Sequence, residues 1–288
     1  MSNGKKKETS NYCRNQMLKF QKKFLFNRNY TVRCSLKFSN ERWISMAYDV
    51  HETSDTNENL PPLIIMHCML GSKIFTVDAR NHGDSPHTLE HNSMLMASDI
   101  LEFMQAHGYK KAAVLGHGMG GRATMYLALK SPDWVERIVI LDVSPIGRPQ
   151  DPITLEQIFI LMKGIEIPNK LTLPEGFDMM AKLFAKIMDY SENVNFILKN
   201  LRKKPNGEFY WNVNVDALME NLRTYTQLRD HIVKYPSFEG LALFVCGNQS
   251  NFVDHSQCAN KTSNITLFVV CHSQANHIRQ ELGKIFGD

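Results

Sequence analysis

The amino-acid sequence predicts an α/β fold with a mostly parallel sheet, covered by helices and carrying an inserted helical cap. Short apolar runs rich in β-branched residues alternate with amphipathic segments over residues 63–141, a pattern typical of parallel strands joined by crossover helices. Between Pro145 and Pro236 the chain becomes mostly helical and rich in Lys, Met and Phe, which predicts a cap over about residues 146–238. Strand-like apolar runs then return.

The domain is expected to begin with two apolar runs, Arg42–Val50 and Leu63–His67. The polar stretch HETSDTNENLPP between them predicts a hairpin or loop. The later elements are expected as strands over Ile74–Asp78, Ala112–Leu115, Arg137–Leu141, Leu241–Cys246 and Ile265–Val270, and as helices over Ser93–Gly108, Arg122–Lys130, Phe177–Met188 and Arg279–Phe286.

Residues 1–40 differ in charge from residues 41–288, which we assign to the folded domain. The net charge is +4, but no acidic residue occurs from Thr9 to Asn40, so the rest of the chain is slightly acidic. Met17–Ser35 interleaves Met, Phe and Leu with Lys and Arg at helical spacing, as mitochondrial transit peptides do. We expect a transit peptide and a mitochondrial location, in the matrix. The alternatives are a disordered basic arm and a cytoplasmic protein.

Composition excludes several other classes. Because the basic residues are not clustered on the predicted domain, a nucleic-acid partner is not expected. The six cysteines form no CxxC pair and are expected to be free thiols. No apolar run reaches the roughly 18 residues of a membrane span. We expect neither a cofactor nor a metal.

The segment AAVLGHGMGG, residues 112–121, has the layout of a nucleophile elbow, in which a buried strand turns sharply into a helix. Gly116, Gly120 and Gly121 supply the room that such a turn needs. The nucleophile position of the GxSxG pattern is Gly118, which has no oxygen and cannot form an acyl-enzyme. The alternative, a phosphate-binding loop, lacks both the GxGxxG spacing and a GKS or GKT ending.

With this elbow, the motifs VDARNHGDSP, SPDWVERIVILDVSP and CGNQSNFV resemble the family of α/β-hydrolase domain-containing protein eleven and its bacterial esterase relatives, from about Ile44 to the C-terminus. The resemblance implies an α/β-hydrolase fold with a helical cap, a mitochondrial location in animals, and serine-dependent hydrolysis of carboxylic esters that include lipid acyl esters such as diacylglycerols.

The resemblance also implies where the catalytic groups fall. The nucleophile falls on Gly118 and is lost, and the acid after the following strand falls on Asp142, which we favour over the alternatives Asp216 and Asp254. The histidine falls on His277 or, as the alternative, on His272, and both lack the family's glycine and tryptophan neighbours. A histidine that merely caps the last helix is the other interpretation of this turn.

The oxyanion-hole donors implied by the resemblance are the backbone amides of Met119 and Met69. Cys68 stands where the family has a glycine. The family also has a helix in the region after Lys73, whereas only CMLGSK separates His67 from Ile74 here. Such a short parallel crossover is unusual, and we expect one face of the sheet to lose part of its cover.

Three hypotheses about function follow. The first is a catalytically impaired pseudohydrolase that binds a lipid, a small acyl ester or a protein partner. The second is an active carboxylic ester hydrolase, which applies if the natural transcript encodes serine at position 118 and a helix after Lys73, or if a water activated by His277 and Asp142 replaces the serine. The third is a degraded copy that does not fold stably.

Overall fold

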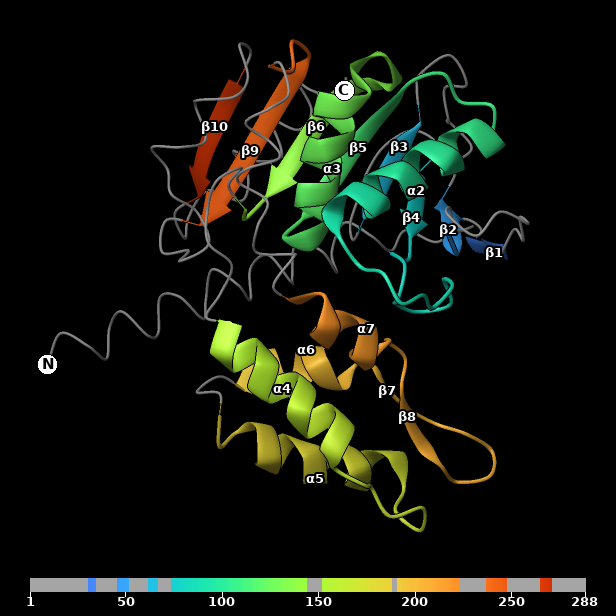
Figure 1. Cartoon of the computed structure of the whole chain (residues 1–288), viewed down its shortest axis with the longest axis vertical. Coiled ribbons are helices and arrows are strands. Elements are labelled where there is room, and N and C mark those ends of the chain that lie inside the picture. The colour runs from blue at the N-terminus through green and yellow to red at the C-terminus, as the bar shows by residue number, and fades with distance from the viewer. Residues whose placement is uncertain are drawn as a thin grey trace, which may run out of the picture.

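A computed structural model of the chain describes residues 31–34, 46–51, 62–66, 74–143, 152–187, 191–222, 237–247 and 265–270. In this part of the chain an eight-stranded sheet packs against helices, and a separate helical unit lies beyond the end to which strands β6 and β9 point (Figure 1). The predicted α/β class is confirmed.

The elements are β1 (Thr31–Cys34), β2 (Tyr48–His51), β3 (Leu63–Met66), β4 (Ile74–Val77), α2 (Ser93–Ala106), β5 (Ala112–His117), α3 (Met119–Lys130), η1 (Pro132–Trp134), β6 (Val135–Leu141), α4 (Pro152–Gly164), α5 (Leu173–Phe184), α6 (Ser191–Leu198), β7 (Leu201–Lys203), β8 (Phe209–Trp211), α7 (Val215–Glu220), β9 (Leu241–Gly247) and β10 (Ile265–Val270).

The strand order of the sheet is β1-β2-β4-β3-β5-β6-β9-β10. Strands β3, β4, β5, β6, β9 and β10 pair in parallel, and β1 and β2 pair antiparallel at one edge. Strands β2 and β3 are not neighbours, because β4 lies between them. Strands β2 and β3 therefore do not form a hairpin with each other. Residues 52–61, which join them, lie outside the described part of the chain.

Strand β1 lies inside the segment 1–40 that the sequence assigns to a leader. Its residues Thr31–Cys34 pair with His51–Tyr48 of β2. The sheet thus begins ahead of the expected boundary at residue 41. The other residues of the segment lie outside the described part of the chain.

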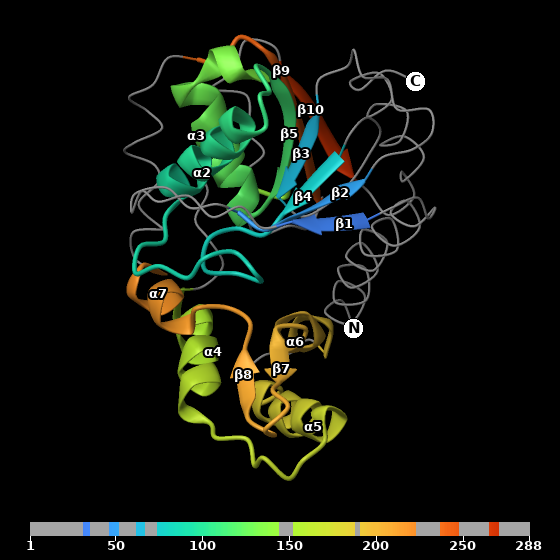
Figure 2. The ribbon, with the colours of Figure 1, turned by 90° about the vertical axis from the view of Figure 1, so that its right-hand side faces the viewer.

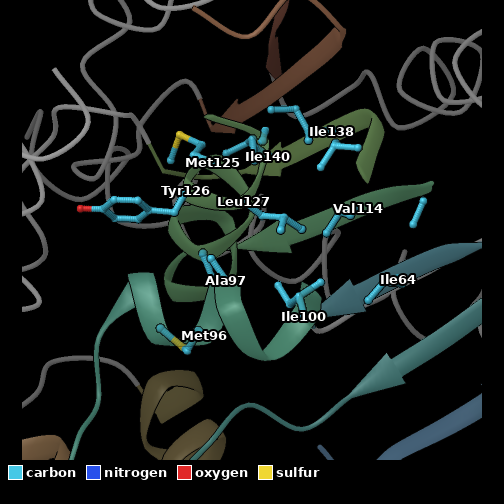
Figure 3. Close-up of a cluster of buried hydrophobic side chains, with 14 of the residues drawn as sticks. Ile64, Met96, Ala97, Ile100, Val114, Met125, Tyr126, Leu127, Ile138 and Ile140 are labelled. Carbon is cyan, nitrogen blue, oxygen red and sulfur yellow. The ribbon is translucent and has the colours of Figure 1, made fainter. Parts of the chain in front are cut away.

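The main core lies between the sheet and helices α2 and α3, which cover the same face (Figure 2). Met96, Ile100 and Leu127 of the helices pack in one buried cluster with Val114 and Ile138 of the strands (Figure 3). Each of these five side chains is at most 2% exposed. Burying a side chain of this size contributes about 1.5–3 kcal/mol, so this layer holds in place the strand that leads to Gly118.

The opposite face of the sheet is also buried. Strand residues that alternate with those of the main core point to that face, and each is at most 4% exposed. They are Leu63, Ala113, Leu115, Val139, Leu243 and Val245. The loss of cover that we expect from the short connection after His67 is therefore not seen at these positions.

The short connection between β3 and β4 is compatible with parallel pairing because both strands are short. Their register runs from Leu63↔Ile74 to Ile65↔Thr76, so the chain has to return by only about 10 Å along the strands. Seven residues can span roughly 20 Å. Residues 67–73 themselves lie outside the described part of the chain.

The cap has a core of its own, built on helices α4, α5 and α6 and the hairpin of β7 and β8. Met180, Phe184 and Leu201 are fully buried in it. In the expected helix 177–188, Phe177, Met180 and Phe184 pack in this core. The helix begins earlier, at Leu173, because Thr172 caps it together with Glu175. Sequence patterns did not predict the hairpin of β7 and β8. Residues 205–207 lie in the turn between these two strands, where Gly207 has φ 92°.

Candidate functional site

Gly118 lies at a sharp turn between β5, which ends at His117, and α3, which begins at Met119. Its backbone has φ 52° and ψ −111°, a conformation that non-glycine residues adopt only under strain. The Gly118 amide donates to the carbonyl oxygen of Leu141 at 3.1 Å, which ties the turn to the end of β6. The turn has the strand–turn–helix geometry of a nucleophile elbow, with a glycine at its central position.

The neighbouring glycines are required by packing. A Cβ on Gly116 would lie 2.3 Å from the carbonyl oxygen of Gly120, and one on Gly121 would lie 2.6 Å from Cγ1 of Val143. A Cβ on Gly118, by contrast, would have no heavy atom within 4 Å. The glycines at positions 116 and 121 therefore allow strand and helix to approach, whereas position 118 has room for a Cβ.

Asp142 lies next to the elbow. His117 and Leu141 are register partners on β5 and β6, so the residues that follow them, Gly118 and Asp142, meet at the carboxyl edge of the sheet. The Asp142 amide donates to the carbonyl oxygen of Val245 at 2.8 Å, and its φ is 50°. Positive φ at a non-glycine residue is uncommon, and residues with this conformation cluster at active sites.

Met119 is half-buried and is the first residue of α3. The amides of the first turn of a helix have no intrahelical partner, because the first backbone bond of α3 comes from Arg122 to the carbonyl oxygen of Gly118 at 3.1 Å. The Met119 amide is therefore a donor at the edge of the elbow. Met69, expected to supply the second donor, lies outside the described residues.

Asp216 lies in the first turn of α7, in the cap. Its carboxylate forms an ion pair with Lys163 of α4 at 2.5 Å, and both side chains are more than half exposed. In the described part of the chain none of its contacts reaches the elbow. Asp254, His272 and His277 lie outside the described residues, so the structure does not place them.

Two buried polar residues beside the elbow were not singled out in the sequence. Asn81 is 0% and His91 3% exposed, and Nε2 of His91 lies 3.1 Å from Sδ of Met119. Burial, with the positive charges of His82 and Arg80 as lesser causes, lowers the pKa of His91 to about 3. The signal that could have found Asn81 is the turn-forming run RNHGDSP, in which Asn81 has φ 66°.

The described residues offer neither a metal centre nor a bilayer-crossing helix. Among them, no three His, Cys, Asp or Glu side chains converge as metal ligands would. None of the described helices is both long and apolar enough to cross a membrane.

The elbow, the parallel sheet and the cap beyond its carboxyl edge define the α/β-hydrolase class. The alpha/beta hydrolase fold family matches residues 52–277, and the chain belongs to that family. It is 31% identical over 223 residues to the sn-1-specific diacylglycerol lipase ABHD11 of Mus musculus, a match that covers 70% of each chain. The resemblance to that protein's family is thereby confirmed.

Other relatives are similarly distant. The chain is 30% identical over 251 residues to ethanol acetyltransferase 1 of Wickerhamomyces anomalus, covering 73% of this chain and 64% of the relative. Among solved structures, a marine microorganism esterase superimposes with a TM-score of 0.70 at 22% identity, covering 84% of this chain and 99% of the esterase. The structural likeness shows the shared fold.

Proposed function

We propose that this chain is a pseudohydrolase, which keeps the hydrolase framework and binds a lipid acyl ester or a related apolar ligand without hydrolysing it through a serine. The observation that carries the proposal is Gly118, whose backbone has the elbow conformation but bears no hydroxyl. Removing the nucleophile from a serine hydrolase can lower turnover by about 10⁶. The framework therefore supports recognition better than turnover.

What remains at the site suits the recognition of an ester carbonyl. The Met119 amide, at the start of a 12-residue helix, is a donor that a carbonyl oxygen can use. In this proposal the carboxylate of Asp142 and the histidine at 277, or alternatively 272, hold the polar end of the ligand. The printed name of the Mus musculus relative, a diacylglycerol lipase, supports a lipid acyl ester as the ligand class.

The proposal is tested with a fluorophosphonate probe, which labels only an activated serine. The purified full-length chain is incubated with the probe beside a known serine esterase as positive control. We expect the esterase to be labelled and this chain to remain unlabelled. Labelling of this chain at any serine of the site overturns the proposal.

Ligand binding is tested separately with a non-hydrolysable ether analogue of diacylglycerol. We expect saturable binding that a large side chain at the open position, Gly118→Trp, abolishes, whereas the exposed cap substitution Glu208→Gln leaves it unchanged. Absence of saturable binding to the native chain removes the lipid ligand from the proposal and leaves a protein partner as the remaining class.

The second candidate, an active ester hydrolase, is favoured by the names of the relatives, which are a lipase and an acetyltransferase. It requires either a serine at position 118 or a water activated by the histidine. Release of fatty acid from diacylglycerol by the native chain, abolished by Asp142→Asn, would establish it.

A mitochondrial location is part of the proposal and is supported by the acid-free stretch from Thr9 to Asn40. Because β1 begins at Thr31, the test compares the full chain with a chain that lacks residues 1–30. We expect fractionation to find only the full chain in mitochondria. Equal distribution of the two would contradict the location.

A further inference from the structure

The loop of residues 78–91, between β4 and α2, lies between the cap and the elbow. The cap reaches it through an isolated bridge of Val213 to His82 and through the Gly83 amide, which donates to the carbonyl oxygen of Asn212 at 2.9 Å. On its other side, the loop presents His91 to Met119 of the elbow. One chain of polar contacts crosses the loop from the first side to the second.

The contact on the cap side is made by Asn214, the residue that caps α7. Its backbone amide donates to the carbonyl oxygen of Asn81 at 2.8 Å. Its Nδ2 donates to Oδ1 of Asn81 at 3.1 Å and to the carbonyl oxygen of Thr88 at 3.1 Å. The cap thus holds both the backbone and the side chain of Asn81.

The orientation of the Asn81 amide follows from its partners. Oδ1 accepts from the Thr88 amide at 2.7 Å as well as from Asn214. Nδ2 must then be the end that donates to the carbonyl oxygen of Glu90 at 3.1 Å and that lies 3.5 Å from Nδ1 of His91. Because an amide nitrogen only donates, Nδ1 of His91 is the acceptor in this pair.

The same contacts favour one tautomer of His91. A neutral imidazole that accepts at Nδ1 carries its proton on Nε2. This proton points along the 3.1 Å contact with Sδ of Met119, a weak acceptor. An unbroken series of donor–acceptor contacts therefore leads from Asn214 of the cap through Asn81 and His91 to Met119, the first residue of α3.

We propose that Asn81 and His91 are positioning residues, which form a relay that sets the position of the Met119 amide according to how the cap docks on the loop. Both relay residues are almost fully buried, where hydrogen bonds are stronger and less exchangeable with water. This inference rests on the proposed function, in which the Met119 amide is the donor that binds the ester carbonyl.

The test follows the Met119 amide directly by NMR in full-length chain labelled with [15N]methionine. The Met119 cross-peak is the one that Met119→Leu removes. Asn214→Ser keeps a residue able to cap α7 but lacks the amide group that donates to Asn81. We expect Asn214→Ser to shift the Met119 cross-peak while leaving that of Met96, buried in the core, in place.

The matched control is Asn221→Ser. Asn221 also joins the cap to the loop, through Nδ2 and the carbonyl oxygen of Leu89 at 2.9 Å, but its contact does not pass through Asn81. We expect it to leave the Met119 cross-peak unchanged. Equal shifts from Asn214→Ser and Asn221→Ser would overturn the relay, because cap docking in general would then explain them.

Substitutions at His91 separate the relay from a merely structural role. In a His91→Leu background, Asn214→Ser should no longer shift the Met119 cross-peak. His91→Gln, which keeps a donor near the Nε2 position, should restore part of the native position of this cross-peak, whereas the shorter His91→Asn should not. A shift on Asn214→Ser that persists undiminished in His91→Leu contradicts the proposal.

A measurement on the native chain needs no variant. Long-range 15N spectra of histidine-labelled protein should show His91 as a neutral ring with its proton on Nε2, and a proton on Nδ1 overturns the relay. All these readouts are independent of ligand binding. If the lipid analogue fails to bind while the relay results hold, the lipid ligand is removed from the proposed function and the relay stands.

Discussion

At the scale of single residues, Gly118 carries the proposed function, and its backbone conformation suits a glycine. Its φ of 52° and ψ of −111° lie where glycine is unstrained and a serine is not. A Cβ at this position would have no heavy atom within 4 Å. The effect of Gly118→Ser on stability is therefore expected to come from backbone conformation rather than from crowding of the Cβ.

We predict that Gly118→Ser lowers the free energy of unfolding by about 1–2 kcal/mol, because the strain of a non-glycine residue is only partly offset by the loss of unfolded-state freedom. Chemical denaturation measures it. Gly116→Ala is the comparison and should cost more, since its Cβ would meet the backbone of Gly120 at 2.3 Å. Equal losses would mean that the turn does not have the described geometry.

His91 makes stability depend on pH. Its pKa is lowered from 6.5 to about 3 in the folded chain, so between these values the unfolded chain binds the proton and the folded chain does not. Stability is therefore lost as the pH falls below 6.5, by about 2 kcal/mol from this residue by pH 5.

The measurement compares the native chain with His91→Gln in urea titrations at pH 7 and pH 5. We expect the native chain to lose about 2 kcal/mol more than the variant over this interval. Identical pH dependence in the two proteins would show that His91 titrates as an exposed histidine does.

At the scale of elements, a buried ion pair fastens the loop after β4 to helix α2. Nε and Nη2 of Arg80 donate to the two carboxylate oxygens of Asp99 at 2.7 and 2.6 Å, and both side chains are at most 1% exposed. Asp78 closes the same loop, accepting from the Asp84 amide at 3.1 Å. The loop that carries Asn81 and His91 is thus held at its base.

We predict that Asp99→Ala destabilises the chain by about 3–5 kcal/mol, because it leaves the Arg80 guanidinium buried and uncompensated. Thermal or chemical unfolding checks this value. Arg80→Met combined with Asp99→Leu should recover most of the loss. The exposed pair of Lys204 and Glu208 is the control, and Glu208→Gln should have a much smaller effect.

Element boundaries show how far sequence patterns reach. The strand at Ala112–Leu115 was predicted within two residues of its observed end, because a buried strand is apolar along its length. The helix predicted from Arg122 begins at Met119 instead. Gly120 and Gly121 have low helix propensity, so the residues of the first turn do not indicate a helix. The β7–β8 hairpin was missed because strands of three residues are too short for periodicity to register.

At the scale of the whole molecule, the cap and the sheet each have a core, and polar contacts of the loop 78–91 join them. The short connection after β3 is tolerated by the sheet, as the parallel register of β3 and β4 shows. What the family's helix would add is therefore a matter of the site rather than of sheet pairing.

We predict that Gly118→Ser alone gives little or no hydrolysis of a short-chain p-nitrophenyl ester, and that the same substitution with the corresponding helix of the Mus musculus relative inserted after Lys73 gives measurable hydrolysis. The reason is that the loop after β3 carries Met69, the second expected carbonyl donor. Substantial activity from the single substitution would show that the helix is dispensable.

The sequence by itself determined the α/β class and the glycine-rich turn with Gly118 at its centre, because strand periodicity, glycine spacing and the identity of residue 118 are all local properties of the chain. Only the tertiary structure decided that β4 lies between β2 and β3, that Asp142 rather than Asp216 lies beside Gly118, and that Asn81 and His91 connect the cap to Met119. These facts depend on hydrogen bonds between residues as far apart as Asn81 and Asn214. Such pairings are set by the path of the whole chain, which no local pattern encodes.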